Sequence, residues 1–534
     1  MTAEAATQDA PVAPAANASA VPVAERRRWV DVALYPIVVG LALLLQLMAI
    51  NGVGFWVSFR AIVVVAVLGI VVSVALRLVI GERDRAGFAS FIAMVALIGG
   101  DPRLVLVALL LVAILVVEAR GLRGRLRVPW PLIGRASRVF ALLLCLAIVV
   151  QAVQLGAINV IGRSLTNEPP FRPAPVFAGT DSPTTPDIYV ILLDGYARGD
   201  ALKQVFGVDE SGFLGQLQQR GFGVSSRALT NYPNTVQVLM AMFNMRLLPD
   251  IPALQPVLAG TNTEAQSAIT HDVVMDNPLF DTLHQRGYEI VGISSGFAEV
   301  SLREADRYIT TGAALNEVEI GLLRRTIFGD VLNTVAPDFA SQQARNRITT
   351  NFGVLGSLAA ERPGHPRFIF DHIPSPHPPW VFNADGSPRT VPDIRQLYAD
   401  DPAQTGLSED ELKAGYAGAV RDLQTPLLDA IDAIDRSAAV PPVILVFGDH
   451  GSWVGALPGD VRLRFLPLLA ARVPGKADPL PKDETLVNVF PDLLNPVLGT
   501  SFPRIDSAPS SMFKGDNEYD LHQLDDPNGA IVSP

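Results

Sequence analysis

The stretch DIYVILLD, residues 187–194, is a short apolar strand that ends in an aspartate. From there the chain alternates similar apolar runs with stretches of helical spacing. This alternation predicts an α/β domain, with a mostly parallel sheet that is flanked by helices on both faces. Further strands are expected at 288–293, 367–370, 443–447 and 464–469, and helices at 210–220, 236–245, 278–286 and 409–436.

Apolar runs fill the chain before this domain. Two or three of them are long enough to span a bilayer alone, which takes about 20 residues. Arginines cluster before the first run, after the second and before the fifth, which places those ends in the cytoplasm. We therefore expect about five transmembrane helices in a cell inner or plasma membrane, with the α/β domain on the extracytoplasmic side. The five runs lie at 32–50, 61–80, 87–99, 104–117 and 139–161.

Composition changes mark the other boundaries of the chain. A stretch dense in Pro, Ser and Thr at 164–186 has the character of a linker. The expected organisation is a disordered cytoplasmic tail at 1–28, a transmembrane domain at 29–163, the linker at 164–186, a catalytic domain at 187–505 and a C-terminal tail at 506–534.

The charge and cysteine content exclude several classes of function. The net charge is -11, and arginines gather near the apolar runs, so the remaining domain is acidic. Nucleic-acid binding needs a basic footprint, and we expect no such partner. The only cysteine is Cys145, which excludes a disulfide within the chain and a cysteine-rich metal site.

Polar side chains follow three of the expected strands. Asp194 follows the first, His372 and His377 follow the strand at 367–370, and Asp449 and His450 follow the strand at 443–447. Sites in open parallel sheets lie beyond the carboxyl ends of the strands. Two carboxylates and an imidazole suit a zinc or manganese ion. The bland alternative is that each aspartate only caps a turn.

Thr235 is the candidate nucleophile, in the segment NYPNTVQVLMAMFNM. Pro233 and Asn234 end an extended stretch, and an apolar helix follows directly. The hydroxyl would then lie at a helix N-terminus, where the dipole and free N–H groups favour an alkoxide and an incoming anion. A threonine that only caps its helix is the structural alternative.

The order of these motifs resembles the alkaline-phosphatase/sulfatase superfamily. The layout is similar to its membrane-bound branch, the lipoteichoic acid synthases, other phosphoglycerol transferases and phosphoethanolamine transferases. The resemblance implies that Asp194, Thr235, Asp449 and His450 bind one divalent metal ion, and that Thr235 forms a covalent phospho-threonine. Zinc and manganese are favoured over magnesium and calcium. His377 would bind the phosphoryl group or protonate the leaving oxygen, and His372 is the lesser candidate.

The sequence also departs from parts of this superfamily. Sulfatases place a Pro and an Arg soon after a Cys or Ser nucleophile, whereas Val, Gln and Val follow Thr235. After His450 the only histidine is His522, so the ligands of a second permanent metal are missing. Arg462 or Arg464 would replace that cation by holding phosphate oxygens, unless they form a solvated strand edge.

The expected function is metal-dependent transfer of a phospho-headgroup, of the phosphoglycerol or phosphoethanolamine type. The donor would be a membrane phospholipid and the acceptor an envelope glycan or glycolipid. One alternative is a hydrolase of the same superfamily, a phosphodiesterase, phosphatase or sulfatase. A second is a catalytically silent envelope protein that binds a partner.

Overall fold

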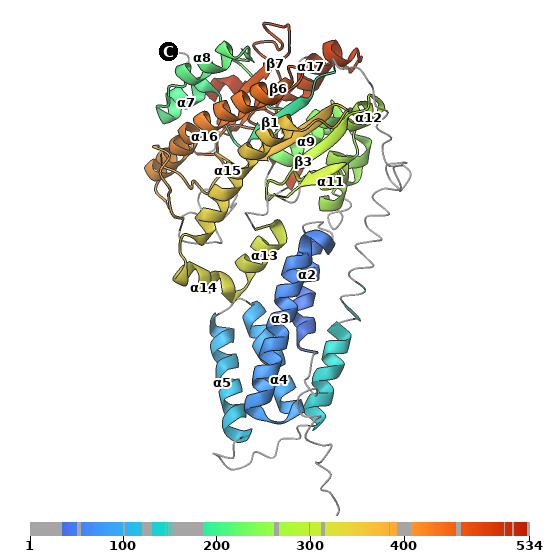
Figure 1. Ribbon diagram of the computed structural model, residues 1–534, viewed down its shortest axis with the longest axis vertical. Coiled ribbons are helices and arrows are strands. Elements are labelled where there is room, and N and C mark those ends of the chain that lie inside the picture. Colours follow the sequence, from blue (N-terminus) through green and yellow to red (C-terminus); the bar gives the residue numbers. More distant parts are fainter. Residues whose placement is uncertain are drawn as a thin grey trace, which may run out of the picture.

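A computed structural model gives the structure of this chain. It describes residues 35–50, 55–99, 102–119, 131–144, 146–147, 150 and 185–530, the last without 261–265, 298–299, 311–314, 384, 392–406, 455–460, 507 and 515–516. The described residues form a group of apolar helices below and an α/β domain above (Figure 1).

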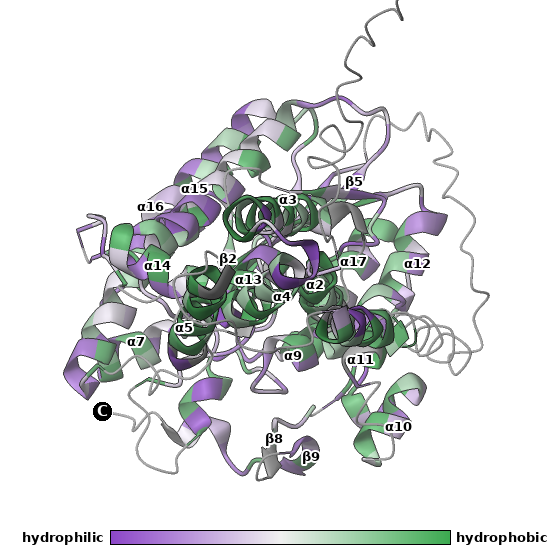
Figure 2. Cartoon of the chain, turned by 90° about the horizontal axis from the view of Figure 1, so that it is seen from below, coloured by the Kyte–Doolittle hydropathy of each residue, from purple (hydrophilic) through white to green (hydrophobic). Residues whose placement is uncertain are grey.

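The apolar helices correspond to the runs in the first third of the sequence. They are α2 (Ile37–Ile50), α3 (Phe55–Ile80), α4 (Arg83–Gly99) and α5 (Pro102–Ala119), and residues 131–144 are helical too. One helix, at Ser58–Ile80, is both long and apolar enough to cross a membrane, and Val105–Val117 is a shorter apolar segment. The predicted five spans are thus not confirmed as a set, and most of the fifth lies outside the described residues. Figure 2 shows α3 and α5 from below as predominantly hydrophobic.

A seven-stranded sheet forms the centre of the α/β domain, in the order β2-β7-β6-β1-β5-β3-β4. Strands β6, β1, β5, β3 and β4 run parallel, and β7 pairs antiparallel with both β6 and β2. The mixed sheet agrees with the predicted α/β class. The strands are β1 (Ile188–Leu193), β2 (Gly223–Val224), β3 (Glu289–Ile293), β4 (Arg307–Ile309), β5 (Arg367–Ile373), β6 (Val443–Phe447) and β7 (Leu469–Arg472).

Helices cover both faces of the sheet because its central strands are apolar on both sides. Every residue of β1 and β6 is buried, as expected for parallel strands between two helical layers. One core joins alternate residues of β1 to α9, α11, α12 and α17, and the other joins the remaining residues to α7, α8, α15 and α16. The helices of this domain are α7 (Gly199–Phe206), α8 (Ser211–Gln219), α9 (Thr235–Asn244), α10 (Gln255–Leu258), α11 (Gln266–Met275), α12 (Pro278–Gln285), α13 (Glu317–Arg325), α14 (Ile327–Val335), α15 (Phe339–Ala360), α16 (Glu409–Ser437) and α17 (Val489–Leu498).

The strand expected at 464–469 is wrong. Residues Arg462–Phe465 form the 3-10 helix η6, and the strand β7 begins only at Leu469. Pro467 interrupts the stretch because it has no N–H for a sheet ladder. The Arg464 carbonyl accepts a hydrogen bond from Gly451 N at 2.7 Å, which binds this segment to the loop after β6.

The C-terminal segment, separated above as a tail, contains a hairpin of β8 (Ser511–Lys514) and β9 (Asn517–Gln523). Tyr519 is buried in the core that contains α9, and Gln237 of α9 donates a 2.6 Å hydrogen bond to the Glu518 carbonyl. Backbone hydrogen bonding and a single aromatic anchor therefore hold a polar segment against the domain. Short 3-10 helices complete the chain at η1 (Leu248–Asp250), η2 (Pro252–Leu254), η7 (Leu486–Asn488) and η8 (Pro527–Ala530).

Candidate metal centre

Asp194 is the first residue beyond β1, at the carboxyl end of the sheet. Its backbone N–H donates to the Ile373 carbonyl at 3.0 Å, so the β1–β5 pairing extends up to the aspartate. The side chain is buried, with 1% of its residue exposed. The sheet itself therefore fixes where this carboxylate lies.

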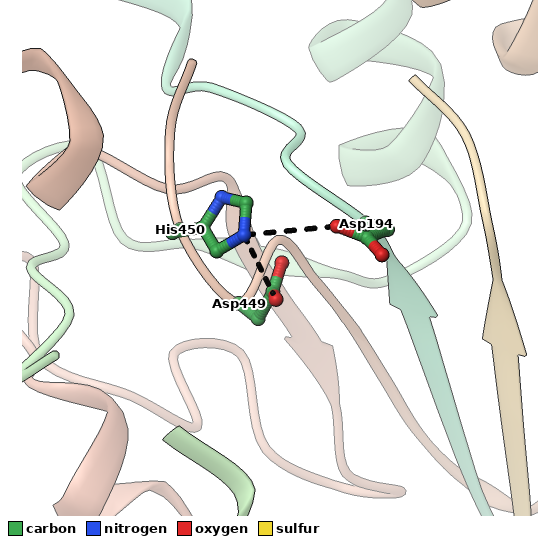
Figure 3. A group of neighbouring side chains, drawn as sticks. All are labelled: Asp194, Asp449 and His450. Atoms are coloured by element: carbon green, nitrogen blue, oxygen red, sulfur yellow. Dashed lines mark ion pairs between the residues drawn. The ribbon is translucent and has the colours of Figure 1, made fainter. Parts of the chain in front are cut away.

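Asp449 and His450 come from the loop that follows β6, the neighbour of β1 (Figure 3). Both are buried, and with Asp194 they offer three ligand atoms that lie within 4.8 Å of one another. His450 Nε2 lies 3.7 Å from Asp194 Oδ1 and 3.3 Å from Asp449 Oδ2. The structure thus brings Asp194 together with two side chains that lie more than 250 residues further along the chain.

The three converging atoms fit a divalent cation. Asp194 Oδ1 and Asp449 Oδ2 are buried, and neither has a hydrogen-bond partner among the described residues. A buried carboxylate without a partner is costly, and a shared cation offsets that cost. Two carboxylates and an imidazole are a donor set that zinc and manganese accept.

His450 is held in the form that binds a metal. Its Nδ1–H donates to the Gly451 carbonyl at 2.8 Å, which leaves the Nε2 lone pair facing the two carboxylates. Burial, together with the nearby Arg464 charge, lowers the pKa of His450 to about 4, although Asp449 and Asp194 oppose the change. A neutral imidazole with a fixed second nitrogen is the usual state of a metal-binding histidine.

His372 lies on β5 and contacts Asp194 from the other side. Its Nε2 is 2.9 Å from Asp194 Oδ2, and its ring stacks on Phe297 with centroids 5.5 Å apart. This contact uses the carboxylate oxygen that does not face His450. We therefore assign His372 to the orientation of Asp194 rather than to substrate binding.

His377 lies next to this group, in the loop after β5. Its Nδ1–H donates to the Pro378 carbonyl at 2.7 Å, and its ring meets Phe297 edge-on at 5.3 Å. Burial alone would raise the pKa of Asp194, but the nearby His377 and the hydrogen bond with His372 hold it below its ordinary value. The Asp194 carboxylate therefore stays ionised near neutral pH.

Thr235 is the first residue of α9, as predicted. The preceding Asn234 is extended, and its side chain makes no capping hydrogen bond. The first N–H groups of α9 are thus not satisfied by a side-chain cap, and Thr235 itself is partly exposed. This arrangement is suited to an anion at the helix N-terminus.

Arg464 connects the segment before Thr235 to the metal loop. Its Nε donates to the Pro233 carbonyl at 2.7 Å, and its guanidinium carbon lies 4.0 Å from the centroid of the Trp453 ring. Arg462 lies beside η8, since a Cβ at Gly529 would lie 2.6 Å from its Nη1. Of the two arginines singled out in the sequence, only Arg464 remains in the proposal.

Tyr416 supports the centre and was missed in the sequence. It lies on α16, where its hydroxyl donates to the Gly195 carbonyl at 2.7 Å and accepts from Ala197 N at 3.0 Å. The tyrosine thus fixes the turn that follows Asp194. Helical spacing of 409–436 indicates only that Tyr416 is on a helix, so no local signal could have found this contact.

No protein-family model and no curated protein matches the chain. Solved structures do show similarity. Phosphoethanolamine transferase A of Neisseria meningitidis, an integral membrane protein, aligns at 12% identity and a TM-score of 0.37 over 88% of this chain and 95% of its own. The lipoteichoic acid synthase LtaP of Listeria monocytogenes aligns at 14% identity and a TM-score of 0.38 over 67% and 83% of the two chains.

The periplasmic domain of phosphoethanolamine transferase EptC of Escherichia coli, in a complex with zinc, aligns at 14% identity and a TM-score of 0.37 over 58% of this chain and 81% of its own. The solved structures to which this chain is similar thus include phosphoethanolamine transferases and a lipoteichoic acid synthase.

Proposed function

We propose that this protein is a metal-dependent enzyme that transfers a phospho-headgroup from a membrane phospholipid to an envelope glycan or glycolipid. One observation carries the proposal: Asp194 Oδ1, Asp449 Oδ2 and His450 Nε2 converge in a buried centre at the carboxyl end of the sheet. Such a centre suits chemistry on an anion, because a cation there offsets the charge of phosphoryl oxygens.

Asp194, Asp449 and His450 would hold the cation, with Thr235 as a further ligand. Bound there, a divalent ion would lower the pKa of the Thr235 hydroxyl and offset the negative charge on the phosphoryl group. Zinc and manganese fit the donor set best.

In the first step, Thr235 Oγ1 attacks the phosphorus of the lipid phosphodiester and passes its proton to a basic side chain at the site. The bond from phosphorus to the diacylglycerol oxygen breaks, and His377 supplies a proton to that oxygen. The hydrogen bond from His377 Nδ1–H to the Pro378 carbonyl orients its ring. The amide groups at the start of α9 and the Arg464 guanidinium offset the charge on the phosphoryl oxygens.

In the second step, an acceptor hydroxyl attacks the phospho-threonine. A new phosphodiester bond forms, and the bond from phosphorus to Thr235 Oγ1 breaks. A basic side chain at the site takes the acceptor proton, and Thr235 Oγ1 recovers the proton that it gave up in the first step. If water replaces the acceptor, the same intermediate gives hydrolysis, which is the alternative function.

The apolar helices support a membrane location. Ser58–Ile80 has the length and hydropathy of a membrane span, and we infer that the remaining apolar helices accompany it as a multi-pass domain. The α/β domain would then face the extracytoplasmic side, where its centre meets lipid headgroups.

Mass spectrometry of the Thr235 peptide tests the proposal. The full protein in nanodiscs, loaded with zinc or manganese, is exposed to phospholipids and then digested with a protease. We expect a phospho-headgroup adduct on Thr235 that disappears in Thr235→Ala and that turns over on addition of a hydroxyl acceptor. Turnover by Thr235→Ala equal to that of the parent protein would refute the covalent step.

A further inference from the structure

A small apolar surface remains exposed on the α/β domain, and it lies on one helix. Among the described residues beyond 150, Val331 and Val335 are the only large hydrophobic residues that are exposed, at 48% and 71%. All other exposed hydrophobic side chains of this size belong to the apolar helices of the first 150 residues. Both valines lie on α14 and are separated by one helical turn.

The sequence of α14 makes it amphipathic. Ile327, Val331 and Val335 recur every four residues and share one face, whereas Asp330 and Asn333 lie toward the other. The exposed side chains of Val331 and Val335 therefore lie on the apolar face of α14. A helix of this kind binds a partner or a lipid surface through its apolar face.

The preceding helix α13 fixes the height of α14 relative to the apolar helices. Val318 of α13 is fully buried in a cluster with Leu44, Leu47, Ala61 and Val65 of α2 and α3. The two carboxylate oxygens of Glu319 accept hydrogen bonds from one edge of the Arg60 guanidinium, at 2.8 Å from Nε and 2.7 Å from Nη2. Arg60 lies on the second turn of α3, roughly 8 Å from the start of that helix at a rise of 1.5 Å per residue.

α14 continues from this anchored helix along the ends of the apolar helices. It contacts α4, and Figure 1 shows α13 and α14 between the α/β domain and α2–α5. The neighbouring α5 exposes Leu106, Leu109 and Leu110 on the same group of helices. The helix α14 therefore adjoins the end of a group of apolar helices that we assign to lipid.

Two arginines close the last turn of α13, directly before α14. They are Arg324 and Arg325, and Arg325 is exposed. Basic residues that flank a short amphipathic helix favour anionic lipid headgroups. The two arginines between α13 and α14 are therefore complementary to anionic headgroups.

We propose that α14 lies in the boundary between headgroups and acyl chains, with Val331 and Val335 in contact with lipid. This rests on the proposed membrane location of α2–α5. It adds a second contact between the α/β domain and the bilayer, beside the helices themselves, and so holds the centre at headgroup level. The membrane-facing helix is thus part of the catalytic domain.

Spin labels on single cysteines test this placement. In a full-length Cys145→Ala background, Val331→Cys and Val335→Cys are labelled in nanodiscs that hold one chain each and contain anionic lipid. Two positions calibrate the measurement: Leu110→Cys on α5 as the lipid reference, and Lys203→Cys, which is exposed on α7, as the aqueous reference. At each position we measure how often the spin label collides with dissolved oxygen, which enters the bilayer, and with a water-soluble nickel chelate, which does not.

We expect the labels at 331 and 335 to match the label at 110, with several-fold greater access to oxygen and less access to nickel than at 203. Nickel access equal to that at 203 would overturn the proposal. Low access to both reagents would also overturn it, because another segment of the chain would then cover α14. If the label at 110 is itself aqueous, the membrane location fails, which distinguishes that failure from a fault in the placement of α14.

Discussion

The backbone N–H of Gly195 donates a 2.9 Å hydrogen bond to Asp449 Oδ1. The residue that follows one proposed ligand thus orients the next ligand and leaves Asp449 Oδ2 for the centre. Gly195 has a φ of +74°, and a Cβ there would lie 3.3 Å from His450 Cε1. Only glycine meets both conditions without strain.

Asp449→Asn should remove metal binding and preserve the fold. An asparagine keeps an acceptor for Gly195 N but loses the charge, so affinity should fall by more than the roughly 10- to 100-fold typical of changes around a ligand. Metal analysis after dialysis checks the stoichiometry. Asp483→Asn, at an exposed aspartate, is the matched control and should bind like the parent protein. Equal metal content in the two variants would contradict this assignment.

Removal of the metal should lower the melting temperature of the parent protein. Bound metal stabilises only the folded state, and its removal leaves two buried carboxylates side by side. Thermal unfolding with and without a chelator measures the difference. Asp449→Asn should melt at the same temperature in both conditions, and a chelator effect that persists in this variant would place the stabilising metal elsewhere.

Tyr416→Phe should weaken metal binding by about 10-fold, because the turn after Asp194 loses two hydrogen bonds. Burial raises the pKa of Tyr416, so its hydroxyl stays protonated in the parent protein. Tyr288→Phe is the matched control, since its hydroxyl donates only to the Pro186 carbonyl, before β1. Metal titration should separate the two variants, and equal affinities would show that Tyr416 supports the fold alone.

Arg464→Ala should reduce kcat by roughly 100-fold, the effect of losing one preorganised donor to a phosphoryl oxygen. Arg464→Lys keeps the charge but not the planar donor geometry, so it should recover only part of the rate. Arg462→Ala, two residues away with its guanidinium beside Gly529, is the control. Steady-state rates at saturating metal decide the matter, and equal losses in both alanine variants would exclude a specific role for Arg464.

Glu210→Gln should stabilise the domain at pH 8 and not at pH 4. Burial raises the pKa of Glu210 to about 8, although the Tyr196 hydrogen bond opposes this. The folded state then binds a proton that the unfolded state releases, so the parent protein loses stability as the pH rises from about 4.5 to 8. The free energy of unfolding of Glu210→Gln at pH 8 should exceed that of the parent protein by a few kcal/mol at most, since each unit of pKa shift corresponds to roughly 1.4 kcal/mol. Melting temperatures at both pH values test this, and a parallel pH dependence in the two proteins would contradict it.

The sequence by itself determined the α/β class and most of the elements. The apolar runs at 188–193 and 443–447 are buried on both faces, and helix α16 begins and ends close to its expected bounds, because local hydrophobic pattern specifies such elements. The strand expected at 464–469 failed because Arg464 and Pro467 take part in contacts with distant loops, which no local pattern records.

The candidate metal centre was likewise predicted in part from the sequence and in part only from the tertiary structure. The sequence determined which residues end the strands, and therefore named Asp194, Asp449 and His450. Only the tertiary structure decided that β1 and β6 are neighbours, which brings these side chains within 4.8 Å. It also decided that His372 supports Asp194 and that Tyr416 fixes the turn, because such contacts depend on packing between segments far apart in the chain.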